Sequence, residues 1–356
     1  MFILNRWYVA GFAHELSDQP LARTLLDEPL VMFRGASGKP VALEDRCCHR
    51  NLPLSHGRVE GGLLTCGYHG MVYDTGGRCV KVPGQDVIPP GAQVRSYPLQ
   101  ERDGLLWLWP GEAARADAAQ IPDYPFHADP RWAHQGSHYR IACNHELIND
   151  NLIDLSHVGY VHGKTIGGTP AAHSEAEMRI ERGAESVIVR RWMRGSVPPP
   201  TYVRAIGFTG LIDRWMEIHF VPGLIRIYIG AEDAGKGLDE AGQMDRMGIR
   251  IFNGVTPETA TSTHYFWSMA HNFRIGEPEV TRALHGEVAA TFEEDRIVVE
   301  AQQQRFSQFP ERKTVQIRTD AGGVHARRVI AELIARERAG PRDAAWLGNL
   351  PEQVTV

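Results

Sequence analysis

Two short clusters of cysteine and histidine constrain this chain more than any other feature of its sequence. The first reads Cys47-Cys48-His49 and the second reads Cys66-Gly67-Tyr68-His69. A zinc finger usually places its cysteines in one knuckle and its histidines on one helix. Here each cluster offers one sulfur and one ring nitrogen. The pattern therefore predicts a metal centre with two thiolate and two imidazole ligands, held between two loops that meet.

This mixed ligand set fits a Rieske [2Fe–2S] cluster, in which one iron keeps two thiolates and the other takes two imidazoles. We assign Cys47 and Cys66 to one iron, and His49 and His69 to the other. A structural zinc site and a set of buried thiols and imidazoles without metal stay open as alternatives. Glycine permits tight loops, and five glycines lie near the ligands: Gly57, Gly61, Gly62, Gly67 and Gly70.

Composition places the chain among ordinary globular proteins. With 356 residues it is long for a single core, so we expect two domains. A net charge of −5 and the lack of a long basic run argue against nucleic acid as a partner. No apolar stretch is long enough to span a membrane and no signal-peptide pattern opens the chain, so we expect a cytoplasmic protein without a membrane partner. Cys48, Cys79 and Cys143 remain as free thiols, since three is an odd number.

The apolar pattern divides the chain into two domains, 1–115 and 116–356, joined by an Ala-rich linker between residues 110 and 120. The first domain consists of short runs typical of strands, which predicts an all-β fold. The second combines longer strand patterns with helices expected near 145–158, 277–306 and 323–338. The predicted fold class is α+β, with an antiparallel sheet and packed helices. The predicted strands are 7–10, 30–33, 41–43, 63–65, 105–109, 187–189, 216–220, 224–229 and 261–267.

A second concentration of polar residues lies within residues 144–162. Asn151, Asp154 and His157 are spaced by three, so on a helix they form one polar ridge. His162 follows five residues after His157 and would point away on an unbroken helix. Gly159 offers a place for the helix to bend, which would let both imidazoles converge on one metal ion.

Two histidines of this kind invite a carboxylate, because mononuclear non-haem iron(II) is typically held by two His and one Asp or Glu. On the helix expected at 277–306, Asp295 falls on a stripe of apolar residues, whereas Glu293 and Glu294 fall on the opposite side. Burying an unpaired carboxylate costs several kcal/mol, so Asp295 needs a cation or donors. A buried ion pair for Asp295 and a solvated histidine pair remain alternatives. The joint prediction is an iron site of His157, His162 and Asp295.

With both sites in place, the chain resembles the oxygenase component of Rieske non-haem iron oxygenases, and within them the vanillate O-demethylase branch. The resemblance covers nearly the whole chain. Beside the two Cys/His clusters it is carried by these segments: Asn5-Arg6-Trp7-Tyr8-Val9-Ala10, residues 101–111, 150–162, Thr256-Pro257-Glu258-Thr259, 320–324 and 327–330.

The resemblance implies a fold and an assembly. A Rieske domain is followed by a catalytic domain of the helix-grip type, with a curved antiparallel sheet over the iron. A homotrimer is implied, in which the cluster of one subunit passes electrons to the iron of its neighbour. Asp154 is implied to bridge the two sites by bonding a cluster histidine and an iron histidine, and Asn151 to position water or a ligand near the iron.

The resemblance also implies the reaction. A flavin and iron–sulfur reductase would pass electrons from NAD(P)H, and O2 would be used to hydroxylate and demethylate a small methoxylated aromatic acid such as vanillate, with release of formaldehyde. Asn253, His264 and Trp267 are candidate pocket residues, and Arg204 or Arg226 a candidate partner for a carboxylate.

Several alternatives concern the substrate and the class of protein. A phenoxybenzoate, or the methyl group of a toluenesulfonate, would also suit such an enzyme. Dicamba-type demethylases carry an aromatic residue nine positions before the iron aspartate, where this chain has Gly286, which argues against a dicamba-like pocket. A Rieske electron carrier needs only about the first 110 residues, and a zinc-binding module needs no His-His-Asp set.

Overall fold

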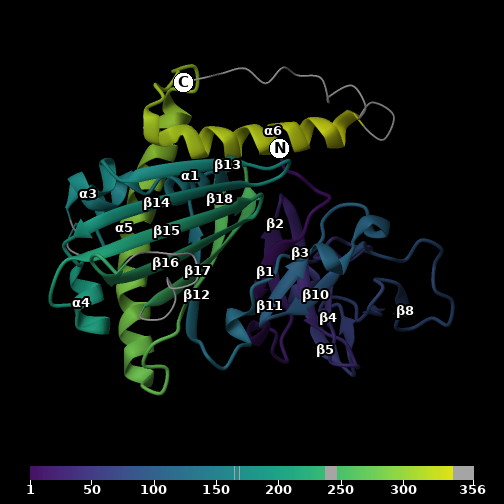
Figure 1. The fold of residues 1–356 in the computed structure, drawn as a ribbon. Helices are drawn as coiled ribbons and strands as arrows, with labels where there is room; N and C mark the ends of the chain where they lie inside the picture. The colour runs from purple at the N-terminus through teal and green to yellow at the C-terminus, as the bar shows by residue number, and fades with distance from the viewer. Residues whose placement is uncertain (164, 168, 237–246, 340–356) are drawn as a thin grey trace.

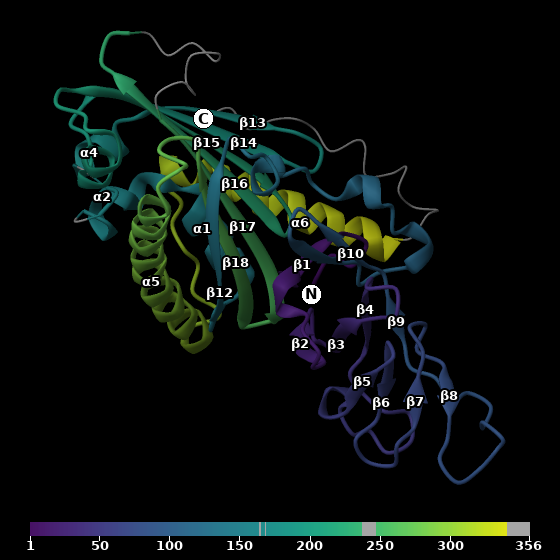
Figure 2. The ribbon, with the colours of Figure 1, turned by 90° about the horizontal axis from the view of Figure 1, so that it is seen from below.

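The computed structural model of the protein describes residues 1–163, 165–167, 169–236 and 247–339. Figure 1 shows two parts, an N-terminal group of small sheets and a larger C-terminal sheet with long helices packed on it. The view from below in Figure 2 shows the sheet of β5 to β8 extending away from the large sheet and from α5. The predicted α+β fold is therefore confirmed, and every predicted strand overlaps an observed one.

The N-terminal part consists of three small antiparallel sheets, with strand orders β1-β11-β10, β2-β3-β4-β9 and β5-β6-β7-β8. Its strands are short and separated by tight turns, as the sequence predicts. The bounds are β1 Tyr8–Phe12, β2 Leu21–Leu25, β3 Glu28–Arg34, β4 Pro40–Glu44, β5 Arg58–Glu60, β6 Leu63–Thr65, β7 Val72–Tyr73, β8 Cys79–Lys81, β9 Ser96–Tyr97, β10 Leu99–Arg102 and β11 Leu105–Leu108.

The C-terminal part is built on one antiparallel sheet of seven strands, in the order β12-β18-β17-β16-β15-β14-β13. Alternate residues of its strands enter the largest hydrophobic cluster of the molecule, together with one face of each long helix. The strands are β12 Ala133–Ile141, β13 Glu177–Arg182, β14 Val187–Ser196, β15 Ile212–Val221, β16 Leu224–Asp233, β17 Gly248–Thr259 and β18 Ser262–His271.

Within the described residues, six α-helices accompany this sheet, and the predicted helices near 277–306 and 323–338 are confirmed as α5 and α6. On α5 the buried positions include Leu284, Val288, Phe292 and Val299, the apolar stripe that the sequence predicts, with Asp295 among them. The bounds are α1 His145–Ile153, α2 Val158–Val161, α3 Pro170–Ser174, α4 Pro200–Ile206, α5 Pro278–Gln308 and α6 Ala321–Ala339.

The predicted helix near 145–158 is corrected, because the chain leaves the helix at Asp154 and not at Gly159. Asp154 has an extended backbone (φ −98°, ψ 96°), and its carboxylate accepts a hydrogen bond from the backbone N–H of Ser156. A single 3-10 turn, Leu155–His157, then leads into α2. Gly159 has a different role, since a Cβ there would lie 2.5 Å from the Cα of Pro170. Of the polar ridge expected on one helix, Asn151 lies on α1, Asp154 caps it, and His157 lies in the 3-10 turn.

The two parts share a hydrophobic cluster, so their relative position is fixed by packing. Trp7, Val9 and Trp107 of the N-terminal part pack with Phe252 and Phe266 of the large sheet. Backbone bonds from Leu26 and Asp27 to Pro257 and Glu258 add to this interface. The predicted division at residue 115 stays a prediction, and its end beyond residue 339 lies outside the described residues.

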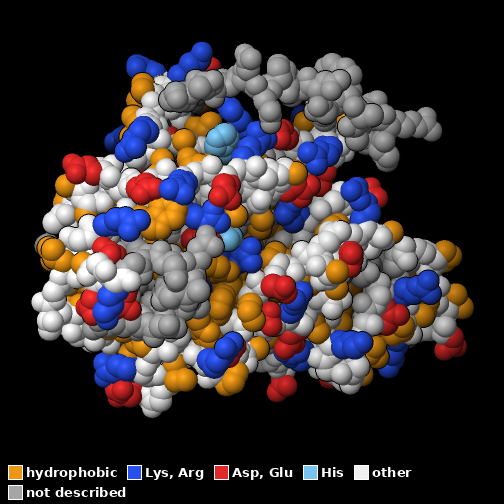
Figure 3. Space-filling model, viewed as in Figure 1, with side chains coloured by type: hydrophobic (Ala, Val, Ile, Leu, Met, Phe, Trp, Pro, Cys, Tyr) orange, Lys and Arg blue, Asp and Glu red, His pale blue; other side chains and the backbone are white. Residues whose placement is uncertain are grey.

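The surface shown in Figure 3 carries basic and acidic side chains interspersed over both parts. Among the described residues, no helix combines the length and the apolar character needed to cross a membrane.

A buried pair of histidines at the interface between the two parts predicts sensitivity to acid. His138 Nε2 lies 2.9 Å from His264 Nδ1, and His264 Nε2 donates to the carbonyl oxygen of Thr24 at 3.0 Å. Burial, and then the charge of Arg23, lowers the pKa of each imidazole from 6.5 to about 4. The folded protein thus binds fewer protons than the unfolded chain between these values. The contribution of these two neutral imidazoles to the stability of the fold is complete above pH 6.5 and is lost as the pH falls toward 4.

We expect each imidazole to remove at most about 1.4 kcal/mol of stability per pH unit in that window. Melting of the cluster-loaded protein, followed by circular dichroism between pH 7.5 and 5, measures the slope. His264→Asn should reduce the slope by the share of one imidazole, because burial also lowers the pKa of His127, His138, His145 and His173 to about 4. His14→Asn, at an exposed position, should keep the parent slope. An unchanged slope in His264→Asn would contradict the assignment.

Candidate metal centres

The two loops that carry the predicted cluster ligands have the same backbone construction. The N–H of Cys47 donates to the carbonyl of Leu52, and the N–H of Cys66 donates to the carbonyl of Met71. In each loop the residue four positions after the cysteine donates back to the cysteine carbonyl, and that residue has a positive φ: 58° at Asn51 and 72° at Gly70. Two matching loops of this kind can present their ligands to one cluster from opposite sides.

The predicted ligands form two close pairs in these loops, one of the two sulfurs and one of the two imidazoles. Cys47 and Cys66 are buried, and the rings of His49 and His69 lie with their centroids 4.6 Å apart. The hydroxyl of Tyr73 lies 3.2 Å from the Sγ of Cys47 and 3.2 Å from that of Cys48. All five cysteines are free thiols. A pair of buried sulfurs and a pair of exposed imidazoles match the donor set of a Rieske cluster.

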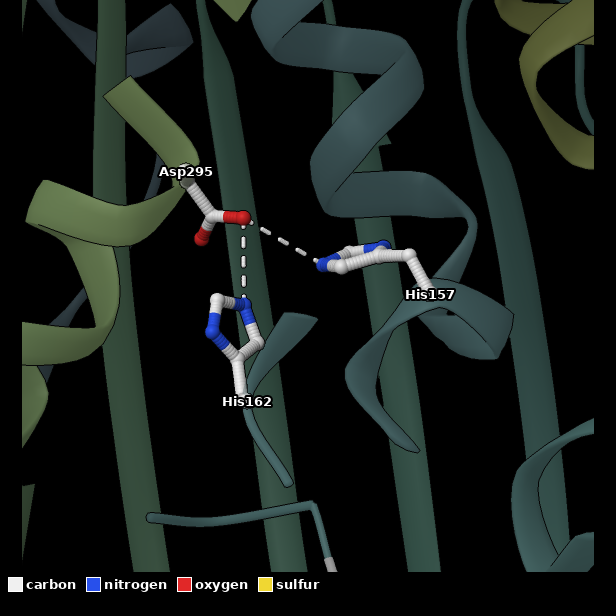
Figure 4. A group of neighbouring side chains, drawn as sticks. All are labelled: His157, His162 and Asp295. Carbon is white, nitrogen blue, oxygen red and sulfur yellow. Dashed lines mark hydrogen bonds and ion pairs between the residues drawn. The ribbon is translucent and has the colours of Figure 1, made fainter. Parts of the chain in front are cut away.

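The second predicted site forms where α2 approaches α5. Figure 4 shows the imidazoles of His157 and His162 directed at the carboxylate of Asp295. The Nε2 atoms of the two histidines lie 3.4 and 3.1 Å from the Oδ1 of Asp295, and one ligand atom from each residue lies within 4.8 Å of the others. His162 is 1% exposed and Asp295 is 9% exposed. Three donors from two segments far apart in the sequence therefore share one point.

Each histidine is held by a bond to its other ring nitrogen. The Nδ1 of His157 donates to the backbone carbonyl of Asp154 at 2.6 Å, and the Nδ1 of His162 lies 2.6 Å from the Oε2 of Glu294. A carbonyl or carboxylate oxygen can only accept here, so Nδ1 carries a proton in each ring. Nε2 is then the ring atom directed at Asp295, and it is the atom that would ligate a metal ion. This second layer of bonds is characteristic of histidines that ligate metals.

The carboxylate of Asp295 is kept ionised in an apolar setting. Burial alone would raise the pKa of Asp295, but hydrogen bonds from His157 and His162 hold it below its usual range. The side-chain amide of Asn151 donates to the same Oδ1 at 2.9 Å. Asn151 therefore orients the carboxylate of Asp295. The implied role of Asn151 in positioning water or a ligand near the iron stays a prediction.

The residues present fit a mononuclear iron site. Ligand atoms about 2.1 Å from one metal ion and at right angles to one another lie about 3 Å apart, close to the two separations found. Two neutral imidazoles and one carboxylate on one side of the site are the ligand set of non-haem iron(II), with positions left for O2 and water.

Asp154 differs in detail from its implied bridging role. Its carboxylate bonds to the backbone N–H and hydroxyl of Ser156, at 2.8 and 2.9 Å, and lies 3.7 Å from Nη1 of Arg191. Within the chain it is the carbonyl oxygen of Asp154, and not the carboxylate, that holds His157. Asp154 is nevertheless in direct contact with the predicted iron ligand His157.

Glu294 was missed by the sequence analysis and its predicted position is corrected. The helical pattern placed Glu293 and Glu294 on the side away from the site, yet Glu294 reaches His162. The two glutamates differ by about 100° around the helix, and only Glu293 pairs with Arg296 on the surface. The long side chain of Glu294, one position before Asp295, reaches His162. Helical periodicity gives the direction of each Cβ but not the reach of such a side chain.

Two of the three candidate pocket residues lie on the sheet face that carries the site. Trp267 stacks on His285 with centroids 4.8 Å apart and meets Phe292 edge-on. Asn253 is fully buried, donates to the carbonyl of Ile225 and accepts from the hydroxyl of Tyr265. Their role toward a substrate stays a prediction.

The third candidate, His264, is corrected because it lies on the opposite sheet face. Residues alternate along β18, so Tyr265 and Trp267 enter the helix-side core, whereas His264 bonds to Thr24 of the N-terminal part. Both candidate arginines are also displaced. Arg204 is exposed and paired with Glu287, and Arg226 donates to the carbonyl of Asp123. These three residues therefore do not face the metal site.

Comparison with known proteins identifies the family. Residues 6–98 match the Rieske [2Fe-2S] domain, and residues 141–336 match the vanillate O-demethylase oxygenase C-terminal domain. The chain belongs to the Rieske non-haem iron oxygenases of the vanillate O-demethylase type. It is thus the oxygenase component of such a system, with a Rieske cluster and a non-haem iron as its family's cofactors.

Relatives match over nearly their full length. The vanillate O-demethylase oxygenase subunit of Pseudomonas sp. (strain HR199 / DSM 7063) is 38% identical, over 98% of this chain and 99% of its own. The iron–sulfur subunit of the toluene-4-sulfonate monooxygenase system of Comamonas testosteroni is 37% identical, over 96% and 99%. A crystal structure of dicamba monooxygenase bound to 3,6-dichlorosalicylic acid superposes with a TM-score of 0.90 at 33% identity, over 96% and 99%.

The bond from Glu294 to His162 predicts an effect on metal affinity. Glu294→Gln should weaken retention of the mononuclear iron roughly 10- to 100-fold, because the ligating imidazole loses a charged acceptor. Competition with a chelator measures that affinity, while the visible absorption of the cluster should not change. Glu293→Gln serves as the matched control on the adjacent, surface-paired residue. Equal iron retention in the two variants would show that Glu294 has no such role.

Proposed function

We propose that the chain is the oxygenase that O-demethylates a small methoxylated aromatic acid related to vanillate. The observation that carries this proposal is the convergence of His157, His162 and Asp295 in a chain that also has the two Rieske-type loops. Its membership of the vanillate O-demethylase family supports the substrate class.

The reaction divides between the bound metals and the chain's own residues. When bound, the cluster supplies electrons one at a time and the iron(II) supplies dioxygen activation. The chain holds the three iron ligands in place through Asp154, Glu294 and Asn151. Apolar side chains, among them Leu152, Phe292 and Val299, lie around Asp295. The substrate methyl carbon is hydroxylated with one oxygen atom of O2, two electrons and two protons, giving a hemiacetal and water. The hemiacetal then collapses to formaldehyde and a phenol.

We infer that the electrons cross between subunits of a homotrimer. In both ribbon views the sheet of β5 to β8, next to the cluster loops, lies on the side of the molecule remote from α5. Asp154 lies on a groove of about 640 Å³ that His157 also lines, so a partner's cluster could approach there. A flavin and iron–sulfur reductase using NAD(P)H is the inferred electron donor. Sedimentation of the loaded protein as a monomer at working concentration would refute the trimer.

A second candidate, hydroxylation of the methyl group of an arylsulfonate, is favoured by one observation. The toluene-4-sulfonate relative matches this chain about as well as the vanillate relative does. Both reactions hydroxylate a methyl carbon. They differ in product, because an aryl methyl group gives a stable alcohol whereas an O-methyl group gives a hemiacetal that collapses.

Product analysis with a competent reductase, NADH and the metal-loaded protein tests both reactions. With vanillate we expect formaldehyde in equal amount to the O2 consumed. With toluene-4-sulfonate the second candidate predicts the benzylic alcohol and no formaldehyde. Oxygen uptake that yields only hydrogen peroxide with both classes would reject both candidates.

A further inference from the structure

Two arginines occupy core positions on neighbouring strands of the large sheet. Arg191 is 2% exposed and Arg214 is 1% exposed. Both interrupt runs of apolar residues at alternate positions, which face the helix-side core: Val187, Val189 and Met193 on β14, and Ile212, Met216 and Ile218 on β15. Arginine is almost never fully buried without a partner, so these two positions require an explanation.

The strand register makes the two arginines neighbours. Arg191 is paired with Met216, and Met193 is paired with Arg214. Arg191 and Arg214 are thus diagonal neighbours on one face of adjacent antiparallel strands, with Cβ atoms on the order of 7 Å apart. Their guanidinium groups belong to one buried patch on the face that carries the metal site.

The hydrogen-bonding capacity of this patch is only partly used. Arg191 donates through Nη2 to the carbonyl of His173, while its Nε and Nη1 have no hydrogen-bond partner. Arg214 makes one long bond, 3.4 Å, to the hydroxyl of Tyr202 and lies over the Tyr202 ring, and its Nε has no partner. Buried donors normally find acceptors, so the patch is short of acceptor atoms.

The patch is also short of negative charge. Among the described residues, the carboxylate nearest to Arg191 is Asp154 at 3.7 Å, and Arg214 forms no ion pair. Asp213, the neighbour of Arg214 in sequence, points to the other face and binds the backbone N–H groups of Gly195 and Gly235. Two guanidinium charges and one carboxylate leave one positive charge, which a single monoanionic group would cancel.

The patch is connected to the iron site on two sides. Arg191 approaches Asp154, whose carbonyl holds His157. Tyr202 lies on α4, whose neighbouring residue Thr201 bonds to Glu287 of α5 and to the carbonyl of Thr165, three residues after His162. These contacts link the arginine patch to the residues on either side of the iron ligands His157 and His162.

We propose that Arg214, with Arg191 and the hydroxyl of Tyr202, binds the anionic head group of the aromatic substrate, a carboxylate or a sulfonate. The proposal rests on the proposed function for the identity of the reaction, and it adds the residues that select an acid. A planar guanidinium presents paired N–H donors that match two oxygens of either head group. Arg214 is the central residue, because Arg191 already has Asp154 and the His173 carbonyl as partners.

Titration calorimetry of the anaerobic, metal-loaded enzyme with three probes tests the site. Vanillate and toluene-4-sulfonate carry the two head groups, and guaiacol is vanillate without its carboxylate. We expect Arg214→Gln to weaken binding of both acids roughly 10- to 100-fold, because a charged hydrogen-bonded pair is lost, and to leave guaiacol binding within about two-fold of the parent. Arg214→Lys should fall between Arg214→Gln and the parent enzyme, since it keeps the charge without the fork. Arg194→Gln, at an exposed position on the neighbouring strand β14, should bind all probes as the parent does.

Circular dichroism confirms that each variant is folded before it is titrated. A loss confined to one acid would identify its head group as the natural one. Equal losses for the acids and guaiacol, or unchanged acid binding in Arg214→Gln and Arg214→Lys, would overturn the proposal. So would a parent enzyme that binds neither acid while it oxidises guaiacol, although the oxygenase function would then stand. Acid binding that depends on Arg214 without oxygen uptake would support the site and reject the proposed reaction.

Discussion

The central constraint in this structure is a carboxylate buried in the apolar stripe of a long helix. Asp295 faces the core between Phe292 and Val299, where an ionised group costs several kcal/mol unless donors surround it. Two imidazoles and the amide of Asn151 supply those donors at one oxygen. The break at Asp154 lies before both histidines, and the chain between His157 and His162 runs through α2.

Hydrophobic packing fixes the relative position of the two parts of the chain. The small sheets that carry the Rieske loops have hydrophobic clusters of their own, and the shared cluster of Trp7, Trp107, Phe252 and Phe266 fixes them to the large sheet. That packing directs the cluster loops away from α5. A chain constructed in this way holds both centres rigidly but apart, which is why electron delivery by a neighbouring subunit is the arrangement that we infer.

Sequence patterns predicted the fold and both ligand sets because each depends on local chemistry. Cysteine and histidine spacing reports directly on metal ligands, and the position of Asp295 in an apolar stripe follows from helical periodicity. What was missed depends on contacts across the fold. Glu294 reaches His162 through side-chain length, and His264 faces the wrong side because the register of β18 was unknown. Arg191 and Arg214 did leave a signal, since each falls on the apolar face of an alternating strand pattern, but only the register shows that they are neighbours.

The central claim, that Asp295 completes an iron site separate from the Rieske cluster, is tested most directly by counting metal. The parent protein, reconstituted without oxygen, should hold about three iron atoms and two labile sulfides per chain. Asp295→Ala should lose about one iron, keep both sulfides and keep the visible spectrum of the cluster, while Glu279→Ala, at an exposed position on the same helix, should match the parent. A full complement of iron in a folded Asp295→Ala variant, with Mössbauer spectra that still show the mononuclear iron(II), would contradict the account.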